Sequence, residues 1–376
     1  MSRYIVNTDD VLDAPFAEAE DELALCLHRI VTNCPPVKPW ANDGFKGTPR
    51  GLWTGPTSIA YLFLWLAYYN PEEDYEGASA MAWCELYLDC GQNVIPLEYN
   101  ESGIKNEYLA WSAMNACVIR SHEAVMRLLQ GIILVQRYTR ADYNEYLSGR
   151  AGALFLLRLT RFFVPSAAEQ LTAAMPPLIN HILAHRPWSF NGREYLGAAH
   201  GNIGIITQIV LSNPSYAPAL EPDLLAILDL QRDDGHWYVR PIDDTAEVVE
   251  WCHGSPGIII SLRALRQHFP ALQGRIDIAI ARGLDEVRQR GVLRKQPNLC
   301  HGASGNAMAL EGSDRSQMMQ WTTLARIQAG IESGEYVKGD DPWGLQWGEA
   351  GRAWAWMIEC REGDLHAFAA YTDVKV

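Results

Sequence analysis

The feature that most constrains the fold of this chain is a short glycine pattern that recurs about every fifty residues. Each copy has a glycine, two further residues, a second glycine or small residue, and then an apolar run of helical length. The first glycines of the five clear copies are Gly149, Gly201, Gly254, Gly302 and Gly348. One such glycine pair is weak evidence, but five in register indicate a tandem repeat.

Two weaker copies precede these five. The copy at 54–66 has Ser58 in place of the second glycine, and the copy at 111–122, "WSAMNACVIRSH", has lost both. Seven units result, and each is predicted to be a helical hairpin because further apolar stretches of helical length lie between the copies. These stretches are 78–88, 123–138, 167–183, 223–231 and 275–289.

A pair of helices cannot bury its apolar face alone, so about seven pairs in tandem must stack. A stack of hairpins that closes on itself forms a ring of inner helices within a ring of outer helices. We therefore expect an all-α fold, an α/α toroid, formed as one domain over 1–376, with 1–45 as an N-terminal extension and outer helix. The best strand signal, "GHWYVRP" at 235–241, is expected to be a loop or a short extended segment.

The glycine turns would enter the inner helices of such a ring. Glycine lets backbones approach closely there and leaves the first N–H groups of each helix directed at the axis. All seven turns would then meet at one central pocket, where residues far apart in sequence become neighbours.

Charge and hydropathy exclude several classes of function. The net charge of −14 argues against a nucleic-acid partner, because phosphate binding needs a basic face. The longest apolar run, 59–69, is shorter than the roughly 20 residues of a membrane helix, so we predict a buried core helix there. The polar, acidic start of the chain lacks the pattern of a secretory signal. We expect a cytoplasmic location, which leaves peripheral membrane association open.

Two of the turns carry the same three residues, Cys-His-Gly, at 252–254 and 300–302. Eight cysteines are too few for a disulfide scaffold in a chain of 376 residues, whereas thiolates with imidazoles favour Zn²⁺. Consecutive residues of a helix point about 100° apart, so a Cys-His pair can chelate one ion only from a non-helical turn. Both pairs satisfy this condition. The four residues could be the four ligands of a structural zinc ion. Alternatively, three of them could bind the ion and leave its fourth coordination position open.

Other turns carry groups suited to proton transfer. His200 lies in "GAAHGNIG", while Asp142 and Glu145 lie in "DYNEYLSGRAG". Together with the Cys-His pairs they form an inventory of metal ligands and acid–base groups.

The segments "WCHGSPG", "LCHGASGNA", "AHGNIGI" and "WGEAG" together resemble the lanthionine synthetase C-like proteins, over nearly the whole chain. The resemblance implies a seven-hairpin α/α toroid with zinc at its axis. It also implies that Cys252, Cys300 and His301 are the metal ligands, that the fourth position is open to a thiol or water, and that His253 does not bind the metal.

The same resemblance implies the reaction. A zinc-bound thiol adds to a dehydroalanine or dehydrobutyrine residue and forms a thioether. The thiol is a peptide cysteine in bacterial members and glutathione in eukaryotic ones. His200 matches the catalytic histidine of the family's AHG segment, and Asp142 matches an acidic residue ahead of the third turn.

The chain is more similar to the glutathione type. It has no leader-binding insertion, and the region before WCHG looks like the eukaryotic loop. Lys295 falls where those members have a glutathione-binding lysine, and Asp340 fits a neighbouring acid, although the expected arginine is absent. The partners expected are glutathione and peptides or proteins that carry dehydroamino acids.

Two other functions fit parts of the pattern. A metal-free glycosidase on an α/α toroid would need two central carboxylates, and Asp142 and Glu145 are too close in sequence to be an obvious pair. A non-catalytic zinc scaffold that binds a partner protein would need the same metal ligands.

Overall fold

The computed structural model describes residues 2–7, 17–37, 49–91, 101–241, 248–339, 341–361 and 367–374. Within these ranges the structure is mostly helical, and its sheet is one short hairpin of β1 (Asp74–Tyr75) and β2 (Ala78–Ser79). The segment 235–241 forms no strand, and Trp237 makes a single bridge with Gln231. The expectation of a loop there is confirmed.

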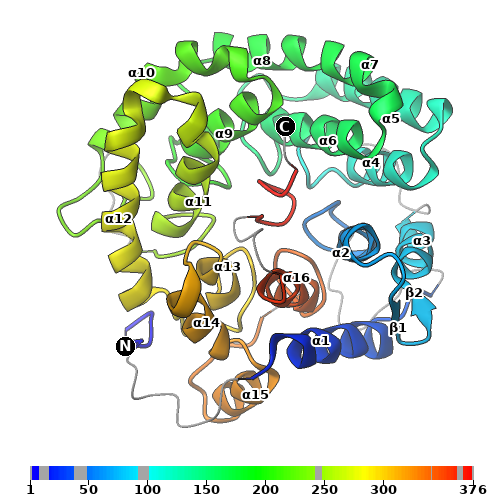
Figure 1. Ribbon diagram of the computed structural model, residues 1–376. Helices are drawn as coiled ribbons and strands as arrows, with labels where there is room; N and C mark the ends of the chain where they lie inside the picture. Colours follow the sequence, from blue (N-terminus) through cyan, green and yellow to red (C-terminus); the bar gives the residue numbers. More distant parts are fainter. Residues whose placement is uncertain are drawn as a thin grey trace.

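Seven described helices form an inner ring (Figure 1). Each contacts the next, and the last contacts the first, so the ring is closed. The α/α toroid predicted from the repeat is therefore confirmed. The inner helices are α2 (Pro56–Tyr69), α4 (Glu107–Ile119), α6 (Arg150–Phe163), α9 (Asn202–Ser212), α11 (Ser255–Leu265), α13 (Ala303–Ala307) and α16 (Glu349–Glu359).

The remaining α-helices surround the inner ring (Figure 1). They bury one face and expose the other, as outer helices of a two-layer fold must. The outer helices are α1 (Ala19–Asn33), α3 (Ala80–Gly91), α5 (His122–Tyr138), α7 (Ala168–Ala173), α8 (Met175–Ala184), α10 (Ala217–Asp229), α12 (Gln273–Arg290), α14 (Gly312–Gln320) and α15 (Leu324–Glu332).

The glycine pattern has a simple steric cause. The first glycine is the N-cap residue of α2, α6, α9, α11, α13 and α16. The second glycine faces a carbonyl oxygen six residues earlier, and a Cβ there would lie only 1.8–2.1 Å from that oxygen. Only glycine allows the turn to fold back so closely onto the helix it starts. The five glycines concerned are Gly152, Gly204, Gly257, Gly305 and Gly351.

The position predicted for the second turn, within 111–122, is wrong. These residues begin inside α4, whose N-cap is Asn106. The Asn106 side chain accepts a hydrogen bond from the Leu109 N–H, so an asparagine cap replaces the glycine cap. The close approach is made earlier, by Gly103, where a Cβ would lie 2.2 Å from the Leu147 carbonyl oxygen.

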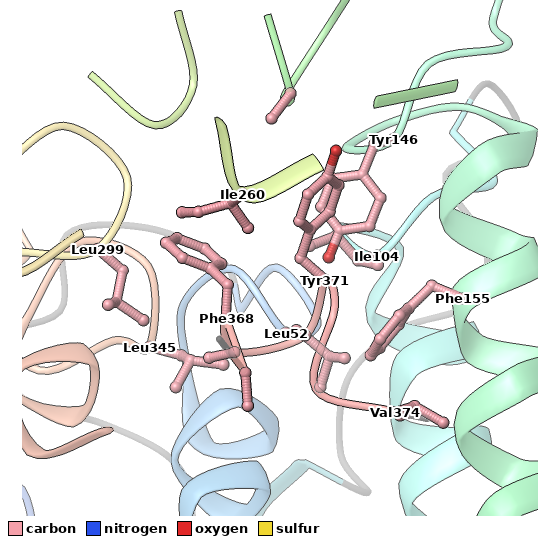
Figure 2. Close-up of a cluster of buried hydrophobic side chains, with 14 of the residues drawn as sticks. Leu52, Ile104, Tyr146, Phe155, Ile260, Leu299, Leu345, Phe368, Tyr371 and Val374 are labelled. Atoms are coloured by element: carbon pink, nitrogen blue, oxygen red, sulfur yellow. The ribbon is translucent and has the colours of Figure 1, made fainter. Parts of the chain in front are cut away.

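Residues 367–374 lie in the middle of the ring (Figure 1). Phe368, Tyr371 and Val374 are buried among side chains of several turns and inner helices (Figure 2). The Tyr371 carbonyl accepts hydrogen bonds from the Arg158 guanidinium at 2.8 Å and the Gln208 amide at 3.2 Å. The chain thus fills the axis of its own ring.

A buried ionic network joins the first described helix to the last. The Arg352 guanidinium lies 2.6 Å from a carboxylate oxygen of Glu22 on α1 and 2.6 Å from one of Glu349 on α16. Arg29 of α1 also contacts Glu349, at 2.9 Å. These contacts help to close the ring. None of the described helices has both the length and the apolar character needed to cross a membrane.

Candidate metal centre

Backbone hydrogen bonds between successive turns bring the predicted ligands together. The Cys252 N–H donates to the Cys300 carbonyl at 3.1 Å, and the Cys300 N–H donates to the Gln346 carbonyl at 2.9 Å. Gln346 in turn donates to the Trp53 carbonyl at 3.1 Å, and the Cys252 carbonyl accepts from Ala199 at 3.3 Å. The turns are thus linked side by side at one end of the ring.

The three residues expected to bind metal form one cluster. The ligand atoms of Cys252, Cys300 and His301 all lie within 4.8 Å of one another. Both thiols are buried and the imidazole is partly exposed. Zinc is bound at about 2.3 Å by sulfur and about 2.0–2.1 Å by imidazole nitrogen, so this spacing suits three ligands of a single ion.

The two thiols and the imidazole influence one another's ionisation. A hydrogen bond to Cys300, together with burial, raises the pKa of the Cys252 thiol. Burial also opposes ionisation of Cys300, but hydrogen bonds with Cys252 and His301 outweigh it and lower the pKa of Cys300 to about 6. Burial opposes protonation of His301, yet the Cys300 charge outweighs it and raises the imidazole pKa. The cluster therefore stabilises a thiolate, the form that binds a metal.

His253 does not join this cluster. Its ring lies 5.5 Å from the Tyr195 ring and 6.0 Å from the His200 ring, measured between centroids. The two Cys-His pairs are thus unequal, because His301 faces the cysteines while His253 faces a histidine of another turn.

A histidine–carboxylate pair includes His200 of the turn next to that of Cys252, since the Ala199 N–H donates to the Cys252 carbonyl. His200 Nδ1 is 3.2 Å from Glu145 Oε2, and Glu145 is only 1% exposed. The Glu145 carboxylate also accepts the backbone N–H groups of Leu147 and Ser148, each at 2.6 Å. The His200 ring stacks on Phe190 with centroids 4.3 Å apart. Nδ1 makes no hydrogen bond among the described residues, so the ring is placed by the charge contact with Glu145 and by its stack on Phe190.

Asp142, the acid expected from the sequence, does not contact His200 in this structure. Both of its carboxylate oxygens accept from the Arg140 guanidinium, at 2.9 and 2.8 Å. These hydrogen bonds lower the pKa of Asp142. The carboxylate that meets His200 is that of Glu145, three positions further along the chain.

Of the two predicted substrate-binding residues, the described structure includes Lys295. Its ammonium lies 2.5 Å from Glu250 Oε1, while Glu250 Oε2 is 3.4 Å from the Cys252 sulfur. Glu250 thus links Lys295 to the cluster. Asp340 lies outside the described residues.

Position within the repeated turn gives a signal for Glu145, which the residue types alone mark only as one of several acid–base candidates, and for Glu250, which they do not single out. Glu145 and Glu250 each stand four residues before the N-cap glycine of an inner helix, and Asn298 holds the same position in another turn. Asn298 also accepts a backbone N–H of its own turn, that of His301, at 2.9 Å. Aligning the copies on their N-cap glycines would have shown this shared position. Phe190 lies outside the repeated turns, and no sequence signal pointed to it.

The fold and the site together define a class of protein: an α/α toroid that gathers two cysteines and a histidine where its inner helices begin. The family described as "Lanthionine synthetase C-like protein" matches residues 109–333, more than half of the chain. The chain therefore belongs to the lanthionine synthetase C-like family.

Individual relatives match shorter stretches. "Glutathione S-transferase LANCL1" of Danio rerio is 35% identical over 120 residues, which cover 30% of this chain and 29% of that protein. "LanC-like protein GCL1" of Arabidopsis thaliana is 27% identical over 184 residues, which cover 44% of this chain and 41% of that protein. The chain thus spans less than half the length of these curated relatives.

The fold matches a solved structure over nearly its full length. Nisin cyclase superposes with a TM-score of 0.60, covering 95% of this chain and 97% of the nisin cyclase chain. The sequence identity is 14%, so the likeness concerns the fold alone.

Proposed function

We propose that the protein binds one zinc ion through Cys252, Cys300 and His301 and catalyses the addition of a thiol to a dehydroalanine or dehydrobutyrine residue of a peptide or protein. The observation that carries this proposal is the cluster itself, with three ligand atoms within 4.8 Å of one another. Two thiols and an imidazole are a donor set that suits Zn²⁺. Three protein ligands leave one position for a substrate.

The reaction joins two bonding changes to two proton movements. A bond forms between the thiol sulfur and Cβ, the Cα–Cβ double bond becomes single, and Cα takes up a proton. Zinc at this site would lower the pKa of the substrate thiol, so that it reacts as a thiolate at neutral pH. The protein must still accept the thiol proton and supply one to Cα.

His200 is the residue we assign to proton transfer, because its Nδ1 lies 3.2 Å from the Glu145 carboxylate and its side chain is partly exposed. Glu145 acts as a positioning residue, whose buried carboxylate helps to hold the imidazole ring in place. A role for Asp142 as a second acid in catalysis remains a prediction. It would require the ion pair between Asp142 and Arg140 to break.

The thiol is proposed to be glutathione or a peptide cysteine. The relative named as a glutathione S-transferase supports glutathione. Lys295 is the residue proposed to attract a carboxylate of glutathione. Asp340 is proposed as a second residue that binds glutathione. A cytoplasmic, reducing location is proposed as well, because none of the eight cysteines forms a disulfide.

An adduct assay tests the reaction. The zinc-loaded protein is incubated with glutathione and a peptide that contains dehydrobutyrine, and the thioether adduct is measured by mass. We expect formation well above the uncatalysed background. The His200→Ala variant should retain zinc and lose most of the activity. If the wild-type protein holds zinc fully but forms no adduct above background, a non-catalytic zinc scaffold becomes the better description.

A further inference from the structure

Two histidines at the end of the outer helix α8 stack on each other at the surface. His181 and His185 are four positions apart, so they project from the same side of the helix. Their ring centroids lie 4.0 Å apart, with 19° between the planes. His181 is partly exposed and His185 is exposed, so solvent reaches both rings. Neither the addition of a thiol nor the closure of the ring of helices requires this pair.

Hydrogen bonds fix which nitrogen of each imidazole carries the proton. His181 Nε2 lies 3.4 Å from the Ala141 carbonyl oxygen, and His185 Nδ1 lies 2.8 Å from the His181 carbonyl oxygen. A carbonyl oxygen only accepts, so these two nitrogens carry the hydrogens when the rings are neutral. The lone pairs are then on His181 Nδ1 and His185 Nε2. Histidines that bind metals are held in this way, with one ring nitrogen donating to a carbonyl and the other facing the ion.

The surroundings of His181 favour its neutral form, which is the form that binds a metal. Burial lowers the pKa of the imidazole, and the charge of Arg150 lowers it further. The same charge repels a metal ion and so limits the affinity of the pair. The guanidinium of Arg186, next to His185 in the chain, is balanced by Asp223 at 2.6 Å. We therefore expect an ion that exchanges with the solution.

The spacing and the residue type suit a transition metal. Two histidines four residues apart on one face of a helix can bind a single ion. Bonds from zinc to imidazole nitrogen are about 2.0–2.1 Å long, so the two nitrogens would have to come within about 3 Å of each other. Rotation about χ2, a soft torsion in histidine, allows this adjustment. Imidazole suits Ni²⁺, Cu²⁺ and Zn²⁺, whereas Mg²⁺ and Ca²⁺ prefer oxygen ligands.

We propose that His181 and His185 form a second metal site, which binds one divalent ion of the Ni²⁺, Cu²⁺ and Zn²⁺ group through His181 Nδ1 and His185 Nε2, with water as the remaining ligands. The site lies on α8 in the outer ring, whereas the proposed zinc centre lies where α11 and α13 begin (Figure 1). The proposal therefore does not rest on the proposed function. Because His181 also bonds to Ala141, the ion would tie α8 to the loop that carries Asp142 and Glu145.

A titration with Ni²⁺ tests the site in the full, zinc-loaded chain. Calorimetry near neutral pH gives the stoichiometry and the affinity, and elemental analysis checks that zinc is retained. We expect about one Ni²⁺ per chain to bind at this pair. His181→Ala and His185→Ala should each weaken the binding at least about tenfold, because one imidazole alone cannot chelate the ion. Both variants should keep the zinc content of the wild-type protein.

The matched control is His122→Ala, which removes an exposed histidine from the outer helix α5. It should leave the nickel affinity unchanged. The proposal would be overturned by a wild-type protein that binds no nickel, by unchanged binding in both α8 variants, or by an equal loss in the His122 variant. A protein that holds no zinc would count against the proposed function alone, because the difference in nickel affinity between wild type and His185→Ala does not require zinc.

Discussion

The ring of Phe368 lies almost parallel to that of Trp251, with centroids 4.5 Å apart and an angle of 10° between the planes. Trp251 directly precedes the proposed ligand Cys252. In the same segment, the Ala369 carbonyl accepts from the Gln346 amide at 3.3 Å, and the Gln346 carbonyl accepts the Cys300 N–H. The segment in the ring axis thus supports both loops that carry the cysteines.

We predict that Phe368→Ala lowers both the stability of the fold and the affinity for zinc. Removing a buried phenylalanine costs about 3–5 kcal/mol, and here the space opens beneath the Cys252 loop. Denaturant unfolding and competition with a zinc chelator measure the two effects. Phe269→Ala is the control, because Phe269 is equally buried after α11 and lies outside these loops. It should reduce stability and leave the zinc affinity unchanged. Equal loss of zinc affinity in both variants would contradict a specific support.

The zinc content of variants shows which residues of the two Cys-His pairs bind the metal. We predict about one zinc per chain for the wild-type protein, loss of zinc on Cys252→Ala or Cys300→Ala, and retention on His253→Ala. The physical reason is that His301 lies in the ligand cluster while the His253 ring lies toward Tyr195 and His200. Elemental analysis after dialysis measures the content. Zinc loss in the His253 variant would indicate a closed four-ligand site instead.

The Glu145 carboxylate next to His200 should contribute more to the rate of thioether formation than Asp142, its more exposed neighbour in the sequence. Glu145→Gln is expected to lower the rate of thioether formation by about 10²-fold, near the low end of general acid–base effects, while zinc content stays constant.

Asp142→Asn is the matched variant for this comparison, since Asp142 pairs with Arg140 at an exposed position. A small effect of this change together with a large effect of Glu145→Gln would assign the positioning role to Glu145. The reverse pattern would restore Asp142 as the acid that the sequence suggested.

A buried carboxyl group on α4 should make stability depend on pH. Burial raises the pKa of Glu107 from its ordinary value to about 7, although it accepts hydrogen bonds from Thr57 and the Gly51 N–H. Between pH 4.5 and 7 the folded protein keeps a proton that the unfolded chain has lost, so the contribution of Glu107 to stability falls as pH rises through this window. The full change is of the order of 3 kcal/mol.

Unfolding free energies at pH 5 and pH 7.5 check this sign. Glu107→Gln should gain stability relative to the wild-type protein as the pH rises, and the exposed Glu123→Gln should not. Asp373 contributes a similar slope in both proteins, because burial raises its pKa to about 6. A constant difference between Glu107→Gln and wild type across this range would contradict the assignment.

The inner helices could be predicted because their signature is local. The second glycine of each turn avoids a carbonyl oxygen only six residues away, so the constraint is present in one short stretch of sequence. The same reasoning misplaced the second turn, since Asn106 caps α4 without a glycine. The cluster of Cys252, Cys300 and His301 could be anticipated as well, because two of the repeated turns carry cysteine and histidine.

What could not be predicted depends on distant contacts. Whether Asp142 or Glu145 meets His200 depends on how one turn faces another, and the residue types alone allow both. The place of residues 367–374 depends on partners far away in the chain, such as Tyr61, which lies 312 positions from Asp373 and donates to it. Nothing within the short segment itself indicates that it belongs in the ring axis.

The closed ring has a consequence for the order of folding. In an open array of repeats, each unit contacts only its neighbours and the array can grow from any point. Here Arg352 must find Glu22 across 330 positions, and the axis is filled by residues 367–374. Contacts of such long range form late and slowly. We therefore expect Cys252 and Cys300 to reach their final spacing only after the last described residues have entered the ring, so that a metal ion would complete an already assembled protein rather than nucleate it.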